Sequence, residues 1–261
     1  MDVEAYLKRI NYHGSLSVSP ETLRDLQVAH LKAVPFENLS IHAGEPIVLE
    51  DEALYKKIVE QRRGGFCYEC NGSFAGLLSA LGFQVEMLAA GVARRQGGFG
   101  PVFDHMALCV TLSERWLVDV GFGDSFLEPL LLDSRDEQIQ GTRSFRIDAE
   151  NDYLILLRRN DGEDWEPQYR FKLQPFGFPD YEEMCNFQQT SPESHFTQNV
   201  ICSRVTEDGR ITLSGMNLVT TTGPERTRHE QVLTSREEYD RLLRDQFGIV
   251  MKNEVKLPSS R

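Results

Sequence analysis

The feature of this chain that most limits its fold is a change of hydrophobic pattern near residue 83. Before that point apolar residues recur at helical spacing, and after it short β-branched and aromatic segments are bounded by Gly, Asp or Asn. Strands are expected at 83–93, 105–112, 116–122, 144–149, 153–158 and 168–174. Helices followed by strands are typical of an α+β protein, here with an antiparallel sheet or barrel.

Three helices are expected in the first 82 residues. One begins after Ser19, a suitable N-cap, with Pro20 at the first helical position. A second covers 51–62. A third begins near Cys67 and ends at Gly82, because glycine readily adopts the backbone conformation that closes a helix.

The end of the chain mixes both patterns. Segments 200–206 and 210–214 flank Asp208–Gly209, a dipeptide typical of β-hairpins. A final helix opens at Ser235, with Glu238 in the capping-box position. We therefore expect a helical part, a mainly β part and a mixed part, at residues 1–83, 84–190 and 191–261.

Composition excludes some classes of function. The chain has 40 acidic and 28 basic residues and a formal net charge of −12, which repels nucleic acid. No apolar stretch suits a membrane span, and the first residues lack the layout of a signal peptide. An odd number of cysteines fits a reducing compartment; they are Cys67, Cys70, Cys109, Cys185 and Cys202. We expect a cytoplasmic protein without nucleic-acid or membrane partners and with no obligatory protein partner.

One cysteine lies where a reactive thiol is favoured. Cys67 follows Gly64, Gly65 and Phe66 and stands at the expected start of a helix. Helix N-termini stabilise negative charge, so this position is expected to lower the pKa of the thiol. The alternative is that Cys67 is a small buried apolar residue, the commoner role for a cysteine.

A thiol nucleophile needs an imidazole to accept its proton and an acidic group to orient that imidazole. His105 opens a clear strand, and Asp119 lies fourteen residues later in an apolar run, where a carboxylate needs a partner. Each residue alone is also consistent with a structural role. A plain hairpin through 113–115 would pair Asp119 near Cys109, roughly 13 Å along the strand from His105. We therefore expect twist, a bulge or another connection to bring the two side chains together.

Three segments of the chain resemble the arylamine N-acetyltransferase family. They are Arg63-Gly64-Gly65-Phe66-Cys67 with Glu69 and Asn71, the strand opened by His105, and Asp119-Val120-Gly121-Phe122-Gly123. The upstream segments Pro35–Leu39 and Arg9–Tyr12 also resemble the family. The resemblance extends from about residue 5 to residue 250 and is looser in the last third.

This resemblance implies an acyltransferase with a ping-pong reaction and no metal. Cys67 would take acetyl from acetyl-CoA, His105 would act as base and then acid, and Asp119 would orient the imidazole. The implied acceptors are small aromatic amines, hydrazines and N-hydroxyarylamines. The implied fold is an N-terminal helical bundle, an antiparallel β-barrel and a smaller α/β lid. Its Cys-His-Asp core is similar to those of papain-like proteases and transglutaminases.

Further positions match the family with less specificity. Phe122 is implied as an aromatic wall for the acceptor ring, and Phe36 as a neighbour of the same cleft, although both could be core residues. Glu37 and Arg63 match positions that form a structural ion pair behind the nucleophile. The resemblance does not assign the residues that contact CoA; cations and flexible amides are available in the loop 94–100 and at Arg226 and Arg228.

Other chemistries remain open on the residues alone. Cys67 and Cys70 with His105 and Cys109 are four zinc-type ligands, and Cys67-x-x-Cys70 by itself could be redox-active. The same triad could serve a thiol hydrolase or a transglutaminase-like enzyme, because a triad does not decide which nucleophile attacks the thioester. A binding module with a retired site is a further alternative.

Overall fold

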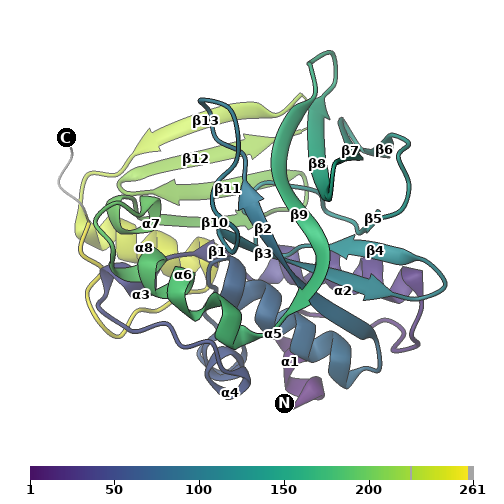
Figure 1. Cartoon of the computed structure of the whole chain (residues 1–261). Helices are drawn as coiled ribbons and strands as arrows, with labels where there is room; N and C mark the ends of the chain where they lie inside the picture. The colour runs from purple at the N-terminus through teal and green to yellow at the C-terminus, as the bar shows by residue number, and fades with distance from the viewer. Residues whose placement is uncertain (224, 258–261) are drawn as a thin grey trace.

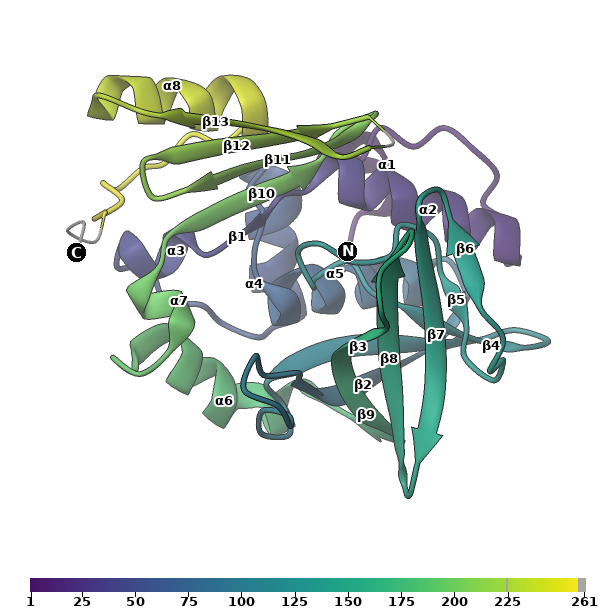
Figure 2. The ribbon, with the colours of Figure 1, turned by 90° about the horizontal axis from the view of Figure 1, so that it is seen from above.

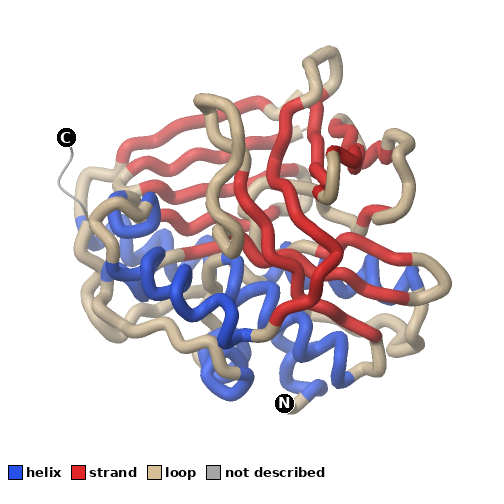
Figure 3. Tube along the Cα trace, in the orientation of Figure 1, coloured by secondary structure: helices blue, strands red, loops and turns tan. Residues whose placement is uncertain are grey.

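The computed structural model describes residues 1–223 and 225–257 and places the first helices along one side of the molecule (Figure 1). They are α1 (Val3–Arg9), α2 (Pro20–Ala33), α3 (Leu39–His42), α4 (Asp51–Tyr55), the π-helical segment η1 (Lys56–Glu60) and α5 (Cys67–Ala80). Figure 3 shows these helices below the strands, which occupy the other half of that view.

Two of the predicted N-terminal helices are confirmed. Ser19 caps α2, because its side chain accepts a hydrogen bond from the backbone N–H of Thr22. Helix α5 begins at Cys67, and Gly82 follows it with a φ of +96°, a conformation that favours glycine. The helix predicted over 51–62 is present from Asp51 to Glu60, and its second half is the π-helical segment η1.

An eight-stranded antiparallel sheet follows the helices. Its strands are β2 (Gln84–Val92), β3 (His105–Thr111), β4 (Arg115–Val118), β5 (Leu130–Leu131), β6 (Gln138–Gln140), β7 (Arg143–Glu150), β8 (Tyr153–Asn160) and β9 (Glu166–Phe176). Their order is β5-β4-β3-β2-β9-β8-β7-β6. The sheet curls into a nearly closed barrel (Figure 2). All six strands predicted for this region are present, but the one predicted over 116–122 ends at Val118.

Glutamine side chains bridge the two outer strands of this sheet. The amide group of Gln138 in β6 accepts a hydrogen bond from the backbone N–H of Leu131 and donates one to its carbonyl. Gln140 bonds in the same way to the backbone just before β5, at Leu127 and Glu128. Unpaired strand edges expose backbone groups. Side-chain amides therefore satisfy some of these groups where the barrel lacks a backbone ladder.

A second antiparallel sheet draws on both ends of the chain. It has the order β1 (Phe36–Glu37), β10 (Ile201–Val205), β11 (Gly209–Ser214), β12 (Asn217–Thr222) and β13 (Thr227–Val232). Helix α8 (Arg236–Phe247) covers it, and α6 (Phe178–Thr190) and α7 (His195–Gln198) lead into it from the barrel (Figure 2). The hairpin at Asp208–Gly209 and the helix capped by Ser235 are confirmed. The three-part division at 83/84 and 190/191 stays a prediction.

Helix α5 lies between the two sheets (Figure 2). Its side chains Phe74, Leu77 and Leu78 are fully buried in one core with Leu108 and Val110 of β3. This packing fixes the helix against the strand that begins at His105. Within residues 1–223 and 225–257, no helix has the length and apolar character needed to cross a membrane.

Candidate active site

Two positions near the start of α5 require glycine, because another segment of the chain packs closely against each of them. A Cβ at Gly64 would lie 1.8 Å from the carbonyl oxygen of Pro35, and a Cβ at Gly121 would lie 2.7 Å from Cα of Cys67. Both distances are far below any real contact, so the Gly64–Gly65 turn and the segment after Asp119 are locked against the start of α5. The sequence thereby brings residues 119–122 beside Cys67.

Cys67 occupies the first position of α5 and is 3% exposed. Burial raises the pKa of its thiol, and the negative charge of Asp119 acts in the same direction, although a hydrogen bond from the backbone of Met106 opposes them. Burial and the charge of Asp119 therefore act against the lowering of the thiol pKa that is expected from the helix N-terminus. A Cys67 thiolate needs a proton acceptor and a cation close by.

His105 and Asp119 are hydrogen-bonded to each other. Nε2 of His105 lies 2.7 Å from Oδ2 of Asp119, and the side chains are 3% and 0% exposed. The bond to the carboxylate leaves Nδ1 of the imidazole as the nitrogen available for a second partner. Such a pair holds the ring in one orientation and stabilises its protonated form.

The hairpin register explains how the pair forms. Leu117 pairs with Cys109 and Val118 with Leu108, so continuing the same register places Asp119 opposite Ala107. Asp119 is thus offset from His105 by two residues, about 7 Å along the strand, and on the same face. The predicted pairing of Asp119 near Cys109 is wrong, and no bulge between β3 and β4 is needed.

Asn71 of α5 holds the carboxylate in place. Its Nδ2 donates to Oδ1 of Asp119 at 2.9 Å and to the carbonyl of Met106 at 2.6 Å. Its Oδ1 accepts from the backbone N–H of Val120 at 2.9 Å, and the N–H of Gly121 donates to Asp119 Oδ1 at 2.8 Å. These donors fix the orientation of the carboxylate. Asn71 belonged to a motif recognised in the sequence, but no role was predicted for it.

Cys67 and His105 line one cavity of about 670 Å³, together with Phe122 and Phe36. The Phe122 ring centroid lies 5.0 Å from that of His105, and Tyr169 packs on the same imidazole at 5.0 Å. Both predicted aromatic residues therefore border the cavity that holds the thiol. Arg94, from the loop 94–100 considered for CoA, and Gly121, from the Asp119–Gly123 motif, also line it. The rest of its wall comes from residues that were not predicted: Val92, Pro101, Asp104, Met184, Phe187, Gln188, Glu193, Ser194, His195 and Phe196.

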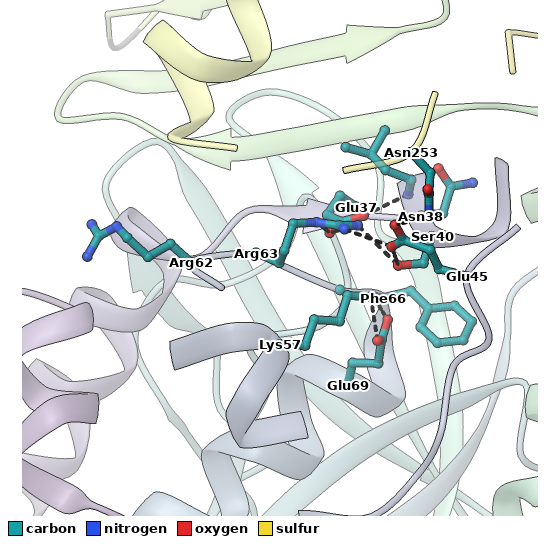
Figure 4. Close-up of polar contacts among 12 residues, drawn as sticks. Glu37, Asn38, Ser40, Glu45, Lys57, Arg62, Arg63, Phe66, Glu69 and Asn253 are labelled. Atoms are coloured by element: carbon teal, nitrogen blue, oxygen red, sulfur yellow. Dashed lines mark hydrogen bonds and ion pairs between the residues drawn. The ribbon is translucent and has the colours of Figure 1, made fainter. Parts of the chain in front are cut away.

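A buried ion-pair cluster lies behind the start of α5 (Figure 4). Arg63 contacts Glu37 at 2.8 Å and Glu45 at 3.1 Å, and donates to the hydroxyl of Ser40. Burial alone would raise the pKa of Glu37, but the nearby Arg63 and Lys57 outweigh it and lower that pKa. The predicted pairing of Glu37 with Arg63 is present, and Figure 4 shows Arg62 pointing away from the cluster.

The cysteines do not form the alternative zinc site. Cys70 lies in the core around α5, where its thiol donates to the carbonyl of Gly65, whereas Cys109 lies in the barrel core. In the described parts of the chain no three His, Cys, Asp or Glu side chains are grouped so as to hold a metal ion. The zinc alternative is therefore wrong for this arrangement.

Comparisons with known proteins extend over nearly the whole chain. A family model described as N-acetyltransferase matches residues 19–255. The arylamine N-acetyltransferase pineal gland isozyme NAT-10 of Gallus gallus is 34% identical over 98% of this chain and 96% of that protein. Arylamine N-acetyltransferase 1 of Homo sapiens is 33% identical with the same coverage. The solved structure of Mycobacterium marinum arylamine N-acetyltransferase in complex with CoA is 34% identical, with a TM-score of 0.87 over 95% of this chain and 93% of that one.

Proposed function

Because this chain belongs to the arylamine N-acetyltransferase family, we propose that Cys67 is the residue that carries the acetyl group. The chain is an acyltransferase that moves acetyl from acetyl-CoA to the nitrogen of an aromatic amine or hydrazine. The observation that carries the proposal is the hydrogen-bonded His105–Asp119 pair in the wall of the cavity that also contains Cys67.

In the first half-reaction the Cys67 thiol gives its proton to Nδ1 of His105, the imidazole nitrogen that does not face Asp119. The sulfur attacks the acetyl carbonyl, the bond from that carbon to the sulfur of CoA breaks, and the departing CoA takes the proton from the imidazolium. Because burial raises the pKa of Cys67, transfer to His105 is the step that makes the sulfur nucleophilic.

In the second half-reaction the amine nitrogen attacks the thioester carbon. His105 accepts a proton from that nitrogen and returns it to the sulfur of Cys67 as the C–S bond breaks and the amide forms. Asp119 keeps the imidazole oriented through both steps. Asn71 is a positioning residue, because it acts through the carboxylate of Asp119.

Two phenylalanines are proposed to bind the acceptor. Phe122 packs edge-on against the imidazole of His105, and Phe36 borders the same cavity with an exposure intermediate between core and surface. An aromatic ring stacked on these side chains would have its amine close to Cys67. Glu37 and Arg63 are proposed as support for the turn that precedes α5, since they touch neither the cavity nor the thiol.

A reducing compartment suits this chemistry, and we propose the cytoplasm. All five cysteines are free, and a buried thiol nucleophile must remain reduced to act. Fractionation of cells that express the chain, followed by detection in each fraction, tests the location.

The activity is tested by following acetylation of an aromatic amine by acetyl-CoA with purified protein. Cys67→Ala should abolish product formation, and Cys70→Ala, on the next buried cysteine of the same helix, should retain it. Product formation by Cys67→Ala at the rate of the unmodified chain would refute the role of Cys67. Release of free acetate and CoA without any amide would favour a thioester hydrolase.

A further inference from the structure

Four arginines converge on one aspartate away from the catalytic cavity. Arg143 of β7 contacts both carboxylate oxygens of Asp124, at 2.8 and 2.7 Å. Arg210 of β11 contacts the same carboxylate at 3.2 Å, and Arg226 at 3.1 Å. Arg158 of β8 donates to the backbone carbonyl of Asp124 at 3.1 Å. We call these five residues the arginine cluster.

The positive charge of this cluster exceeds the negative charge that it contacts. Arg143 and Arg210 have side chains that are 11% exposed, and Arg158 is 19% exposed. Among the ion pairs of the described residues, these arginines meet only one other carboxylate, that of Glu166, 3.5 Å from Arg158 and 63% exposed. Removing charge from water is costly unless opposite charge compensates it. The four guanidinium groups thus share two carboxylates, which leaves an excess of two positive charges.

The electrostatic and hydrogen-bonding state of the cluster agrees with this count. Burial lowers the pKa values of Arg210 and Arg226, and the charge of Arg143 lowers both further. Nε of Arg143 and Nε of Arg158 are buried and have no hydrogen-bond partner among the described residues. Buried donors without partners are uncommon in folded proteins. The cluster thus combines an excess of positive charge with two buried N–H donors that have no hydrogen-bond partner among the described residues.

A cavity of about 470 Å³ opens on the cluster. Asp124, Arg143, Arg210 and Arg226 line it, and so do the hydroxyl-bearing residues Thr142, Thr206 and Thr221. Its carboxylates other than Asp124 are all exposed, and Glu207 among them pairs with Lys32; they are Glu128, Glu207 and Asp208. Among the charged lining residues, Arg143 and Arg210 are accordingly the least exposed, whereas the acidic residues other than Asp124 are solvated.

The cluster lies close to the catalytic cavity along the chain. Gly121 is packed on Cα of Cys67, Phe122 lines the catalytic cavity and Asp124 lines the second cavity. Three residues span at most about 11 Å, so Cα of Asp124 is no farther than that from Cα of Gly121. The arginine cluster and the catalytic cavity are therefore lined by neighbouring parts of one short segment of the chain.

We propose that the arginine cluster binds a phosphate group. Planar guanidinium groups match phosphate oxygens in charge and geometry, and three of them line this cavity beside hydroxyl groups. The phosphate belongs either to a CoA-type acyl donor or to free phosphate. The assignment to a CoA-type acyl donor rests on the proposed function. The presence of a phosphate-binding site does not depend on that function.

A purely structural reading makes the cluster a clasp between the two sheets. Arg143 and Arg158 belong to the barrel, whereas Arg210 belongs to the C-terminal sheet. The phosphate-site and clasp interpretations predict different results for the variant Asp124→Asn. Removing the carboxylate of a phosphate site removes a repulsive charge and should tighten phosphate binding. If the cluster is only a clasp, Asp124→Asn should lower the melting temperature, and the variant should show no phosphate binding.

The test is calorimetric titration of the full chain with CoA, with pantetheine, which lacks phosphate, and with inorganic phosphate. The main variant is Arg226→Gln, since Arg226 is the most exposed of the four arginines and its replacement perturbs folding least. The matched control is Arg228→Gln, two residues away, where the side chain is 64% exposed and pairs with Glu230. Melting temperatures identify any variant that fails to fold.

We expect Arg226→Gln to weaken CoA binding about tenfold, as for the loss of one charged hydrogen bond, and to leave pantetheine binding unchanged. Arg228→Gln should match the unmodified chain. A loss confined to inorganic phosphate would assign the site to free phosphate. Equal affinities of the unmodified chain and Arg226→Gln for CoA and for phosphate, with no tightening in Asp124→Asn, would overturn the proposal. None of these titrations requires acetyl transfer, so failure of Cys67 acetylation would be a separate result.

Discussion

Nε2 of His105 lies 2.7 Å from Oδ2 of Asp119, across a hairpin whose register offsets the two residues by two positions. The short turn between β3 and β4 sets this offset. Asp119 is the first residue after β4. The chain turns after it, so that the backbone N–H of Gly121 donates to the carboxylate of Asp119. One hairpin thus positions both members of this hydrogen-bonded pair.

The orienting role of Asp119 predicts a large loss of activity in Asp119→Asn. An amide neither stabilises an imidazolium nor holds the required tautomer, so kcat should fall by about 10³–10⁴-fold, as for comparable triads. Steady-state rates of arylamine acetylation measure this effect. Asp133→Asn is the matched control, because Asp133 is an exposed partner of Arg115 and its loss should leave kcat within twofold. A kcat for Asp119→Asn within tenfold of the unmodified chain would contradict the role.

The high pKa of Cys67 predicts how its alkylation depends on pH. Burial favours the neutral thiol, so alkylation by iodoacetamide at neutral pH should depend on proton transfer to His105. In His105→Gln we expect alkylation of Cys67 at neutral pH to slow by about tenfold or more. That deficit should shrink as rising pH deprotonates the thiol directly. Mass spectrometry of the Cys67 peptide follows the rate, with the exposed His13→Gln as control. A pH profile unchanged in His105→Gln would contradict the account.

The place of Phe122 in the catalytic cavity predicts a selective effect on the acceptor. Phe122→Ala removes a ring that packs on His105 at 5.0 Å between centroids. We expect KM for an aromatic amine to rise about tenfold, as for loss of one aromatic contact. The rate of Cys67 acetylation by acetyl-CoA should change less than threefold. Stopped-flow measurement of the first half-reaction separates the two. An equal loss in both half-reactions would mean that Phe122 acts through the catalytic residues instead.

The buried pair of Glu37 and Arg63 predicts a pH-dependent contribution to stability. The pKa of Glu37 is lowered from 4.5 in the folded chain, so its stabilising effect is present above that value and is lost as pH falls through the folded pKa. At neutral pH, Glu37→Gln should lower the free energy of unfolding by about 3 kcal/mol, because the buried Arg63 loses its fully buried partner and keeps only the partly exposed Glu45.

Urea unfolding of the unmodified chain and Glu37→Gln across the acidic range measures this difference. The gap in unfolding free energy should narrow at pH values below 4.5. Glu230→Gln is the control, since its pair with Arg228 is exposed and is worth less than about 1 kcal/mol. A gap that stays constant as the pH falls would show that the charge of Glu37 is not the stabilising feature.

Local patterns in the sequence predicted much of the fold. The cap at Ser19, the start of α5 at Cys67 and the hairpin at Asp208–Gly209 follow from short-range rules, and each is present. The residue opposite Asp119 could not be placed correctly, because strand register depends on how many residues form the turn. The observed register places Asp119 opposite Ala107 and not Cys109.

Other parts of the site depend on contacts that the sequence pattern does not contain. The cavity wall includes Met184, Phe187 and Phe196, which come from α6, a helix that was not predicted, and from α7. The burial that raises the pKa of Cys67 likewise comes from segments distant in the sequence. Charge clusters such as Arg143 with Asp124 join a strand to a distant loop and cannot be identified from spacing.

The central claim is that Cys67 carries the acetyl group, and the most direct measurement is the intact mass of the protein after brief exposure to acetyl-CoA. The unmodified chain should gain the mass of one acetyl group and lose it when an aromatic amine or a hydrazide is added. Cys67→Ala should gain nothing under the same conditions. Absence of the gain in the unmodified chain across donors and pH values, or the same gain in Cys67→Ala, would contradict the claim.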